Sequence, residues 1–468
     1  MILYKIQNSV KQQQGYICIY LLQFFAIMAF RHRTYQPVEK PVEHITITQI
    51  MPPQQEHPIT RFRHQRPLRN PSKPSHLTSA SAAPQFFNTI PKLNETHPNF
   101  ILLKHPDKLT KLEQEEIVGF EKIYYFGQNA QKNYNMTKTN YGYDDSEGDV
   151  KPVLKDHVSY RYELLQLLGQ GSFGKVFRAI DHLDKSIVAL KMLKNRKRFR
   201  KQGLVELKLL QTLKDNDPNN ENYCIRIKNK GEFRSHIYFV TEILECDLYA
   251  LLCKNNLQGL HISQIKKFAQ QSLKCIKFSN ELGIIHADIK PENILISKNG
   301  DIQIIDWGSG AFVGQTIYTY IQSRYYRAPE VILGLPYSTP IDVWSLGCVL
   351  CELLTGQPIF PGEDENDQLG KICEFLGIPD SKTLALSPRR TDFFWSAGNS
   401  RILLRTNHKV GKSNFSQIIG NGGSQFVDLI KKMLVLDPIK RSTPEQLLVH
   451  EFFTNNLELP ALLTKQLK

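Results

Sequence analysis

The stretch from His286 to Gly308 carries four residues whose types and spacing suit phosphoryl transfer. It reads H-A-D-I-K-P-E-N-I-L-I-S-K-N-G-D-I-Q-I-I-D-W-G. This reaction requires in-line positioning and neutralised charge more than covalent chemistry by the protein. Asp288 could orient a hydroxyl nucleophile, and Lys290 could offset charge on the moving phosphate. Asn293 and Asp306 could hold magnesium through oxygen atoms. We therefore predict a phosphoryl-transfer site, with Asp288, Lys290 and Asn293 as its catalytic residues.

A glycine-rich segment, L-G-Q-G-S-F-G-K-V, lies upstream. Glycine has no Cβ, so the backbone can approach phosphates closely. This spacing also fits a dinucleotide-binding turn that opens a helix. Strand-like residues flank the segment on both sides, which favours a strand–turn–strand lid over a nucleotide. The predicted contacts are Leu168, Gly169, Gln170, Gly171, Ser172, Phe173, Gly174, Lys175 and Val176.

The order of the motifs along the chain is that of protein kinases. The glycine-rich segment precedes the strand pattern I-V-A-L-K and then the stretch with Asp288. A-P-E follows at Ala328–Glu330, and D-V-W-S-L-G follows at Asp342–Gly347. Each motif alone also has an ordinary structural explanation, such as a turn or a charge on a helix surface. Their joint occurrence in one order indicates a protein kinase fold.

The elements between these motifs must position the nucleotide. Lys191 ends a strand pattern and is expected to contact the α- and β-phosphates, with Glu206 in the helical pattern L-V-E-L-K-L-L as its ion-pair partner. Thr241–Leu244 is the expected hinge, whose backbone would bind adenine and whose Thr241 would line the back of the pocket. Outside the glycine-rich segment, the predicted contacts are Ala189, Lys191, Glu206, Thr241, Glu242, Leu244, Leu295 and Asp306.

The chain has 468 residues, enough for roughly three domains of about 150 residues. The pattern from Tyr160 to Leu244 is mainly strands, and from there to Phe453 it is mainly helix. We predict an α+β, two-lobed protein kinase fold with a β-rich lobe on an α-rich lobe. The expected divisions are an N-terminal extension at 1–98, an accessory region at 99–161, the kinase domain at 162–453 and a C-terminal tail at 454–468.

The N-terminal extension has an unusual composition. Residues 31–95 are rich in Pro, Gln, His, Ser and Thr and are expected to be disordered, because they cannot bury enough apolar surface to offset ordering entropy. Residues 15–30 form an apolar run of 16 residues, shorter than the ~20 that a spanning helix needs. We therefore do not favour a membrane anchor, and translation from Met28 would remove the run.

The formal net charge is +14, and residues 1–95 hold 11 Lys and Arg against 4 Asp and Glu. Such charge can attract nucleic acid or anionic lipid, but a basic disordered tail without a specific nucleic-acid partner is the favoured interpretation. The run K-N-R-K-R-F-R-K at 194–201 fits a nuclear import signal and a solvated basic connection equally well. We expect a cytoplasmic protein, with the nucleus as the alternative location.

The eight cysteines are scattered and suggest no disulfide framework, which fits a reducing compartment. Cys348 and Cys351 form a lone C-x-x-C inside an apolar helix pattern. No second pair or nearby His completes a zinc site, so we predict that both are buried as small hydrophobic residues.

Residues 100–128 contain signals of folded structure. Thr110 is a candidate N-cap for a helix at Lys111–Val118, with Glu113 completing a capping box. The following apolar segment, Ile123–Phe126, is too hydrophobic for a free linker. We expect it to dock on the small lobe.

The chain resembles the dual-specificity tyrosine-regulated kinases (the DYRK family), in particular the class with an N-terminal accessory region. Y-T-Y-I-Q-S-R-Y-Y-R-A-P-E at 318–330 is similar to the activation loop of that family. D-H-V-S-Y-R-Y-E-L-L at 156–165 is similar to its homology box, and K-L-T-K-L-E-Q-E-E-I-V-G-F-E-K-I-Y-Y-F-G at 108–127 to its accessory element. The resemblance covers roughly residues 100–453.

This resemblance implies a Ser/Thr kinase that uses ATP and Mg²⁺ and autophosphorylates Tyr320. Arg324 and Arg327 could then bind the phosphate. Protein substrates are expected to carry Pro after the target residue and Arg before it, and Glu292 could receive that Arg. The family pattern also pairs Glu330 with Arg441, where an ordinary surface pair is the alternative. We expect a monomer.

Three positions depart from the family pattern. Ala287 replaces the usual Cys, Trp307 replaces the usual Phe after the magnesium-binding Asp, and Thr241 replaces a bulky Phe at the back of the pocket. These departures leave a pseudokinase scaffold, which binds nucleotide without turnover, as the alternative function. None of them removes a group that would touch phosphate or metal.

Overall fold

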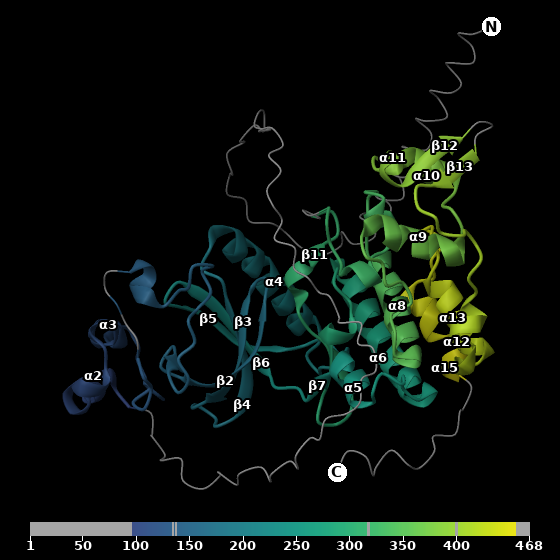
Figure 1. The fold of residues 1–468 in the computed structure, drawn as a ribbon. Coiled ribbons are helices and arrows are strands. Elements are labelled where there is room, and N and C mark those ends of the chain that lie inside the picture. Colours follow the sequence, from purple (N-terminus) through teal and green to yellow (C-terminus); the bar gives the residue numbers. More distant parts are fainter. Residues whose placement is uncertain (1–95, 133–134, 136–137, 316–318, 398–400, 455–468) are drawn as a thin grey trace, which may run out of the picture. The chain divides into compact units, whose positions relative to one another are not determined.

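An antiparallel sheet of six strands forms the small lobe (Figure 1). The computed structural model describes residues 96–132, 135, 138–315, 319–397 and 401–454, all within the unit Phe87–Lys468. In spatial order the strands are β1 (His157–Val158), β2 (Tyr162–Gly171), β3 (Gly174–Asp181), β4 (Ile187–Leu193), β6 (His236–Glu242) and β5 (Ile227–Phe233).

Alternation of side chains explains why these segments form a sheet. In β4 every second residue is buried, including Val188 and Leu190, because successive side chains of a strand point to opposite faces. β2 begins with the same alternation, but its glycine-rich end is exposed. The sheet is therefore anchored at the start of β2 and leaves its glycine-rich end at the surface.

Helix α4 (Lys197–Asn216) packs against this sheet through Leu209, Leu210 and Leu213. It begins inside the basic run at 194–201. The basic run is largely solvated, as predicted, but only residues 194–196 form the connection, because the mostly exposed residues at 197–201 already belong to the first turns of the helix. Burial of Gln202 and Gly203 in the next turn fixes that conformation.

An accessory segment docks on the outer part of the small lobe (Figure 1). It contains α2 (Pro98–Lys104) and α3 (Lys111–Glu116). The predicted capping box of Thr110 and Glu113 is present, although the α-helix ends at Glu116 and continues to Gly119 as a 3₁₀ turn. Ile123 and Phe126 are buried in the same cluster as strand residues, which confirms the predicted docking of Ile123–Phe126.

Buried charges tie α3 to the sheet. The Glu113 carboxylate lies 2.8 Å from the Lys132 ammonium, 3.0 Å from His157 Nε2 and 3.0 Å from the Arg234 guanidinium. Burial alone would raise the pKa of Glu113, but His157 and Lys132 hold it well below its usual range. Arg234 also contacts Glu116 at 2.6 Å. Two cations already neutralise the cluster, so its acids serve as an ion-pair network rather than as metal ligands.

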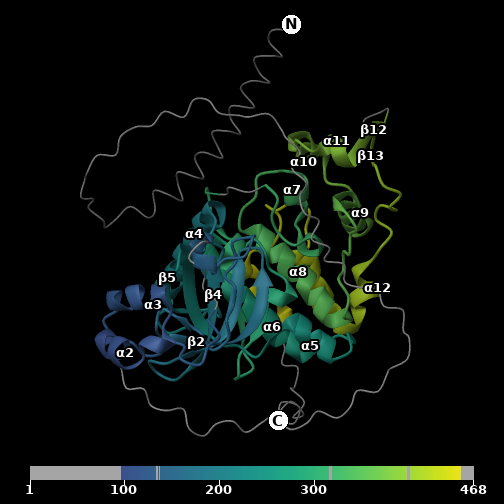
Figure 2. The ribbon, with the colours of Figure 1, turned by 60° about the vertical axis from the view of Figure 1, so that its left-hand side comes forward.

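The large lobe is mainly helical, and α6 and α8 lie side by side in it (Figure 2). Every residue of α8 from Ile341 to Leu354 is buried, including Cys348 and Cys351, as predicted. The helices are α5 (Leu248–Lys254), α6 (Ile262–Glu281), α7 (Pro329–Ile332), α8 (Pro340–Thr355), α9 (Glu365–Leu376), α10 (Ser381–Leu386), α11 (Arg390–Phe393), α12 (Phe415–Ile419), α13 (Ser424–Met433), α14 (Pro444–Leu448) and α15 (Glu451–Thr454).

Short strands complete the large lobe and confirm the predicted α+β, two-lobed architecture. They are β7 (Cys246–Asp247), β8 (Ile284–Ile285), β9 (Ile294–Ile296), β10 (Ile302–Ile304), β11 (Ala311–Phe312), β12 (Phe394–Ala397) and β13 (Arg401–Leu404). Among the described helices, none has the length and apolar character needed to cross a bilayer. The predictions for residues 15–30 and 31–95 lie outside the described residues.

The ion-pair network predicts a large cost for removing Arg234. In an Arg234→Met variant, Glu113 and Glu116 lose a buried cation, which should reduce the free energy of unfolding by about 3–5 kcal/mol. Arg200→Met is the matched control, because Arg200 and Glu232 form an exposed pair worth about 0–1 kcal/mol. Chemical denaturation measures both, and equal losses in the two variants would contradict the structural role of the network.

Candidate active site

The three predicted catalytic residues lie together on the loop between β8 and β9. Lys290 Nζ lies 2.7 Å from Asp288 Oδ2. The Asn293 side-chain amide donates to the Asp288 backbone carbonyl at 2.9 Å and lies 3.3 Å from Asp288 Oδ2. These bonds use the amide nitrogen of Asn293, so its amide oxygen is the atom available to a metal. Three residues predicted from one motif are thus brought into direct contact.

Asp342 of α8 anchors this loop from below. Its carboxylate accepts hydrogen bonds from the backbone N–H groups of His286 and Ala287, at 2.7 and 2.9 Å. Burial raises the pKa of Asp342, although those two amides oppose the shift. Ala287 has a φ of 62°, and its left-handed backbone is held in place by this contact. The helix therefore fixes the position from which Asp288 projects.

Lys191 lies between two carboxylates. Its Nζ is 2.7 Å from Glu206 Oε1 and 2.8 Å from Asp306 Oδ1. The first distance confirms the predicted pair of Lys191 with Glu206. Burial would lower the pKa of Lys191, but Asp306 and Glu206 together raise it. Burial would likewise raise the pKa of Asp306, but Lys191 brings it down to about 2. Burial raises the pKa of Glu206, and the positive charge of Lys191 opposes that rise.

The glycine-rich segment is a hairpin, as predicted, with Gly171 paired to Gly174 across the turn. Gly174 has a φ of 155°, and an added Cβ would lie 2.0 Å from the Met192 carbonyl oxygen. A Cβ added at Gly169 or Gly171 would meet nothing within 4 Å. Packing therefore requires glycine at position 174, whereas Gly169 and Gly171 leave open space beside the backbone.

Two residues predicted as nucleotide contacts direct their side chains toward the accessory region instead. Gln170 donates to Asp149 at 3.2 Å. Lys175 is buried and contacts the Val150 carbonyl at 2.9 Å and Asp145 at 3.3 Å. Their backbone remains part of the hairpin, but these side chains hold residues 145–150 against it.

The predicted hinge, Thr241–Leu244, begins within the last two residues of β6 and continues beyond it. Gln303 of β10 donates to the Glu242 carboxylate at 2.6 Å, which links the two lobes at this point. Thr241 pairs with Ala189 across the sheet. Apolar side chains on both lobes are only half-buried or exposed here: Leu168, Val176, Ala189, Leu244 and Leu295. Such surfaces suit a purine ring, and the oxygen atoms of Asn293 and Asp306 suit Mg²⁺, so the residues fit MgATP.

Ser323 also contacts the catalytic aspartate and was missed from the sequence. Its backbone N–H and hydroxyl donate to Asp288 Oδ1 at 3.0 and 2.8 Å, and its Oγ lies 3.3 Å from Lys290 Nζ. The available signal was a hydroxyl residue between Tyr320 and the A-P-E motif. The segment was read for its tyrosines and arginines, and the bond to a residue 35 positions earlier is not visible locally.

Tyr320 is 64% exposed, and its ring lies over the Arg327 guanidinium at 4.0 Å. Arg327 is buried and donates to the backbone carbonyls of Ile321 and Gln322 and to Glu365. Arg324 donates to the carbonyls of Gly362 and Glu363. The structure therefore places Arg327 beside Tyr320 and engages Arg324 with the loop before α9.

Trp307, which stands where the family usually has Phe, fits into the packing of the lobe. Trp307 is 1% exposed, donates to the Ile304 carbonyl at 3.3 Å and meets the His286 ring at a centroid distance of 4.6 Å.

Glu330 and Arg441 form a buried ion pair with two hydrogen bonds, at 2.8 and 3.0 Å, so the surface-pair alternative is wrong. Neither feature displaces Asp288 or Asp306.

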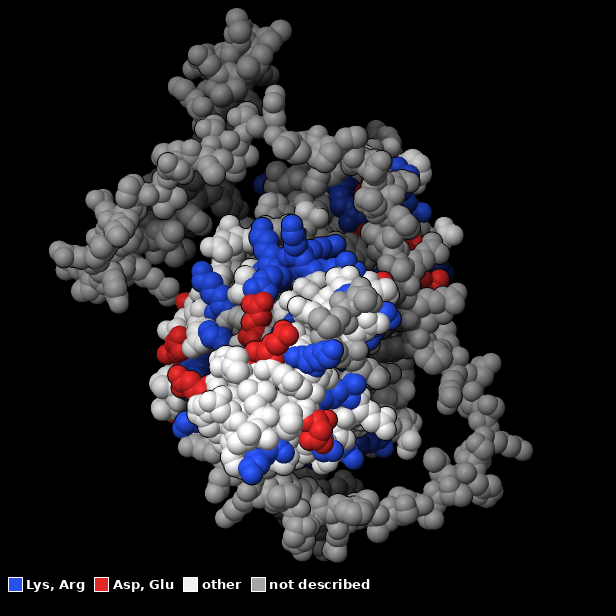
Figure 3. Space-filling model, turned by 90° about the vertical axis from the view of Figure 1, so that its left-hand side faces the viewer, with Lys and Arg blue, Asp and Glu red and all other residues white. Residues whose placement is uncertain are grey.

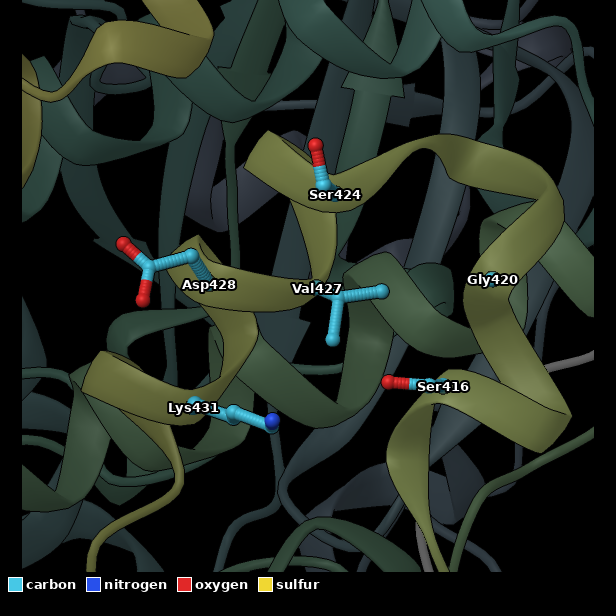
Figure 4. Close-up of a pocket in the computed structure, with 6 residues that line it drawn as sticks. All are labelled: Ser416, Gly420, Ser424, Val427, Asp428 and Lys431. Atoms are coloured by element: carbon cyan, nitrogen blue, oxygen red, sulfur yellow. The ribbon is translucent and has the colours of Figure 1, made fainter.

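A separate hollow of about 380 Å³ lies between α12 and α13 (Figure 4). It is lined by Ser416, Gly420, Ser424, Val427, Asp428 and Lys431. Asp428 is already paired with Lys432 and His450. The hollow contains none of the predicted site residues.

The fold and this site define a protein kinase, and the family model described as "Protein kinase domain" matches residues 162–453. The chain is 42% identical to Dual specificity tyrosine-phosphorylation-regulated kinase 2 of Drosophila melanogaster over 76% of this chain and 51% of that protein. It is 41% identical to Dual specificity tyrosine-phosphorylation-regulated kinase 3 of Homo sapiens over 79% of this chain and 67% of that protein.

A third relative is DYRK-family kinase pom1 of Schizosaccharomyces pombe, 42% identical over 75% of this chain and 33% of that protein. The chain thus spans about half the length of the fly relative and a third of the yeast one. It belongs to the dual-specificity tyrosine-phosphorylation-regulated kinase family.

Anchoring by Asp342 predicts a stability effect independent of catalysis. Asp342→Ala leaves two buried N–H groups without an acceptor, which should cost about 1–3 kcal/mol of unfolding free energy for each. Asp392→Ala removes an exposed partner of Arg389 and should cost about 0–1 kcal/mol. Denaturant titration compares the two, and a wild-type midpoint for Asp342→Ala would refute the anchoring.

Proposed function

We propose that this protein is an ATP-dependent kinase that phosphorylates Ser and Thr of protein substrates and autophosphorylates Tyr320. One observation carries the proposal: Lys191, Glu206 and Asp306 form one ionic cluster, while Asp288, Lys290 and Asn293 form a second cluster of residues in direct contact. Together they provide a phosphate clamp, a hydroxyl-orienting acid and two oxygen ligands for a metal. Phosphoryl transfer needs these groups and little else.

The residues divide the work of transfer. MgATP supplies the phosphoryl group and a metal charge that offsets its negative oxygens. Lys191 binds phosphate oxygens, and Asn293 and Asp306 offer oxygen ligands. Asp288 accepts a bond from the substrate hydroxyl, as it already does from the hydroxyl of Ser323. Lys290 bonds the other carboxylate oxygen and carries positive charge toward the phosphate.

The pseudokinase alternative has no support among these contacts. Trp307 packs inside the lobe and Ala287 keeps its backbone bond to Asp342. Every group assigned to phosphate or metal is present and ionic or polar contacts hold it in place.

The proposed phosphate on Tyr320 would find donors nearby. Arg327 lies beside the ring, and Arg324 has a buried Nε–H with no acceptor among the described residues. A phosphotyrosine adds close to two negative charges and could bond both guanidinium groups. Tyr318, the first tyrosine of the motif, lies outside the described residues.

The proposal extends to substrates and location. Substrates are proteins with Pro after the phosphorylated residue and Arg before it, and Glu292, beside the catalytic Asn293, receives that Arg. The protein acts as a monomer in the cytoplasm, and the nucleus is the alternative location.

Activity should depend strongly on Asp288 and less strongly on Ser323. Asp288→Asn should lower kcat by ~10²–10⁴-fold, the usual contribution of a positioned acid or base. Ser323→Ala removes a hydrogen bond to a charged group, typically worth about 1.5–3 kcal/mol, and should lower kcat by roughly 10–100-fold. Ser323→Thr keeps the hydroxyl and should restore most of the rate. Peptide phosphorylation with ATP and Mg²⁺ measures all three, and an Asp288→Asn protein at the wild-type rate would refute the assignment.

Autophosphorylation gives a second expectation. Recombinant protein made without any added kinase should carry phosphate on Tyr320 by mass spectrometry, because the catalytic groups of the same chain supply the reaction. Asp288→Asn protein should lack this phosphate, and Tyr320→Phe locates it. If the intact enzyme phosphorylates peptides but leaves Tyr320 bare, the autophosphorylation proposal fails while the kinase assignment stands.

A further inference from the structure

A short acidic turn, residues 144–150, projects from the accessory region onto the small lobe. An isolated bridge pairs Asp144 with Val150, and Ser146 and Glu147 are exposed at the tip. Asp145 closes the turn by accepting bonds from the N–H groups of Glu147 and Asp149. The turn therefore presents a serine hydroxyl at the surface on a defined scaffold.

The turn lies against the start of α4. Arg196, the residue before the helix, donates from its guanidinium to the Ser146 carbonyl, and the Asn195 N–H donates to the Gly148 carbonyl at 2.7 Å. A Cβ added at Gly148 would lie 2.9 Å from Arg196 side-chain atoms. The guanidinium is thus packed along the turn, within side-chain reach of Ser146.

This end of α4 carries an unbalanced positive charge. Lys197, Arg198 and Lys201 have no acidic partner among the described residues, and the first turn of the helix contains no acid. A helix N-terminus already bears a partial positive charge, so basic residues there are unfavourable without an anion. On the face drawn in Figure 3, Lys and Arg side chains gather into a basic band beside a smaller acidic group.

The acids of the turn would repel an added phosphate only weakly, because most already have partners. Asp144 bonds Asn140, Asn195 and His236. Asp145 and Asp149 lie near the ammonium groups of Lys175 and Lys194, at 3.3 and 3.2 Å.

We propose that Ser146 is a phosphorylation site for an acidophilic protein kinase, and that Arg196 and the basic start of α4 hold the phosphate. Glu147 is exposed directly after Ser146, and Asp145 directly before it is partly exposed, so the serine has acidic neighbours that such enzymes recognise through basic grooves. The serine oxygen forms a bond to the γ-phosphorus of ATP as the bond to ADP breaks, and the hydroxyl proton passes to the modifying kinase. Glu147 follows Ser146, so the Pro-directed activity proposed above does not account for the modification.

A phosphate at this location would also affect the glycine-rich hairpin and the position of α4. The turn also holds the glycine-rich hairpin through the contacts of Asp149 with Gln170 and of Asp145 with Lys175. Helix α4 carries Glu206, the partner of Lys191. A phosphate that joins the turn to α4 would therefore brace the hairpin and the Lys191–Glu206 pair together.

The test uses the full chain with Asp288→Asn, so that autophosphorylation and the proposed activity do not enter. The protein is incubated with ATP and a purified acidophilic Ser/Thr kinase, or without the kinase, and phosphate is located by mass spectrometry. We expect phosphate on Ser146, lost in Ser146→Ala, and a rise in Tm of about 2–4 °C, the shift that one or two new charge-assisted bonds give in a domain of this size.

Two further variants identify the phosphate-binding group, each compared with its own unmodified form. Arg196→Gln should be phosphorylated but lose at least half of the Tm rise. Lys208→Gln is the matched control, because it removes the same charge from the same helix about 18 Å further along, and it should keep the full rise. The proposal is overturned if intact protein takes no phosphate on Ser146, if Tm is unchanged or falls, or if Arg196→Gln keeps the full rise.

Discussion

The active arrangement depends on one buried ammonium group, that of Lys191, shared between Glu206 and Asp306. Burial of a lone charge is costly, and the cost is offset only when partners of opposite charge lie at bonding distance. Glu206 belongs to α4 and Asp306 follows β10 of the large lobe, whereas Lys191 belongs to β4. Pairing this one cation with both carboxylates therefore holds three separate elements of the two lobes together.

Helix α4 is consequently the element whose position matters most, and several contacts besides the ion pair hold it. Gln202 donates to the Gly308 carbonyl at 2.7 Å, which joins the helix to the segment after Asp306. Phe199 meets Phe173, at the tip of the glycine-rich hairpin, edge to face. The acidic turn at 144–150 contacts Arg196, the residue before the helix. The accessory region thus supports the same elements that the Lys191 cluster brings together.

The sequence was most informative where the deciding contacts are local or carried by a motif. Thr110 and Glu113 are three residues apart, so a capping box could be recognised directly. Asp288, Lys290 and Asn293 occupy one loop. Arg234, by contrast, meets Glu113 from 121 positions away, and no periodicity indicates that pair. Such contacts depend on how the accessory segment and the sheet come together in three dimensions.

The basic run at 194–201 illustrates a second limit. Local charge disfavours a helix start made of Lys and Arg, because the helix dipole repels cations there. Tertiary packing overrides that preference: Gln202 and Gly203 are buried, and an added Cβ at Gly203 would lie 2.0 Å from a Leu193 side-chain carbon. The side of the helix that faces the lobe decides the conformation, and the exposed charges are left for other contacts to balance.

In the loop that carries Tyr320 and Ser323, the contacts that position the backbone are distinct from the proposed site of phosphorylation. Arg327 already bonds the carbonyls of Ile321 and Gln322 and the Glu365 carboxylate, so the backbone that carries Ser323 to Asp288 is held without any phosphate. The Tyr320 ring lies on the outer face of the same guanidinium and is largely exposed. A phosphate on Tyr320 would therefore add charge balance to a segment that is already in place, so its main effect should be on the rigidity of the loop rather than on its path.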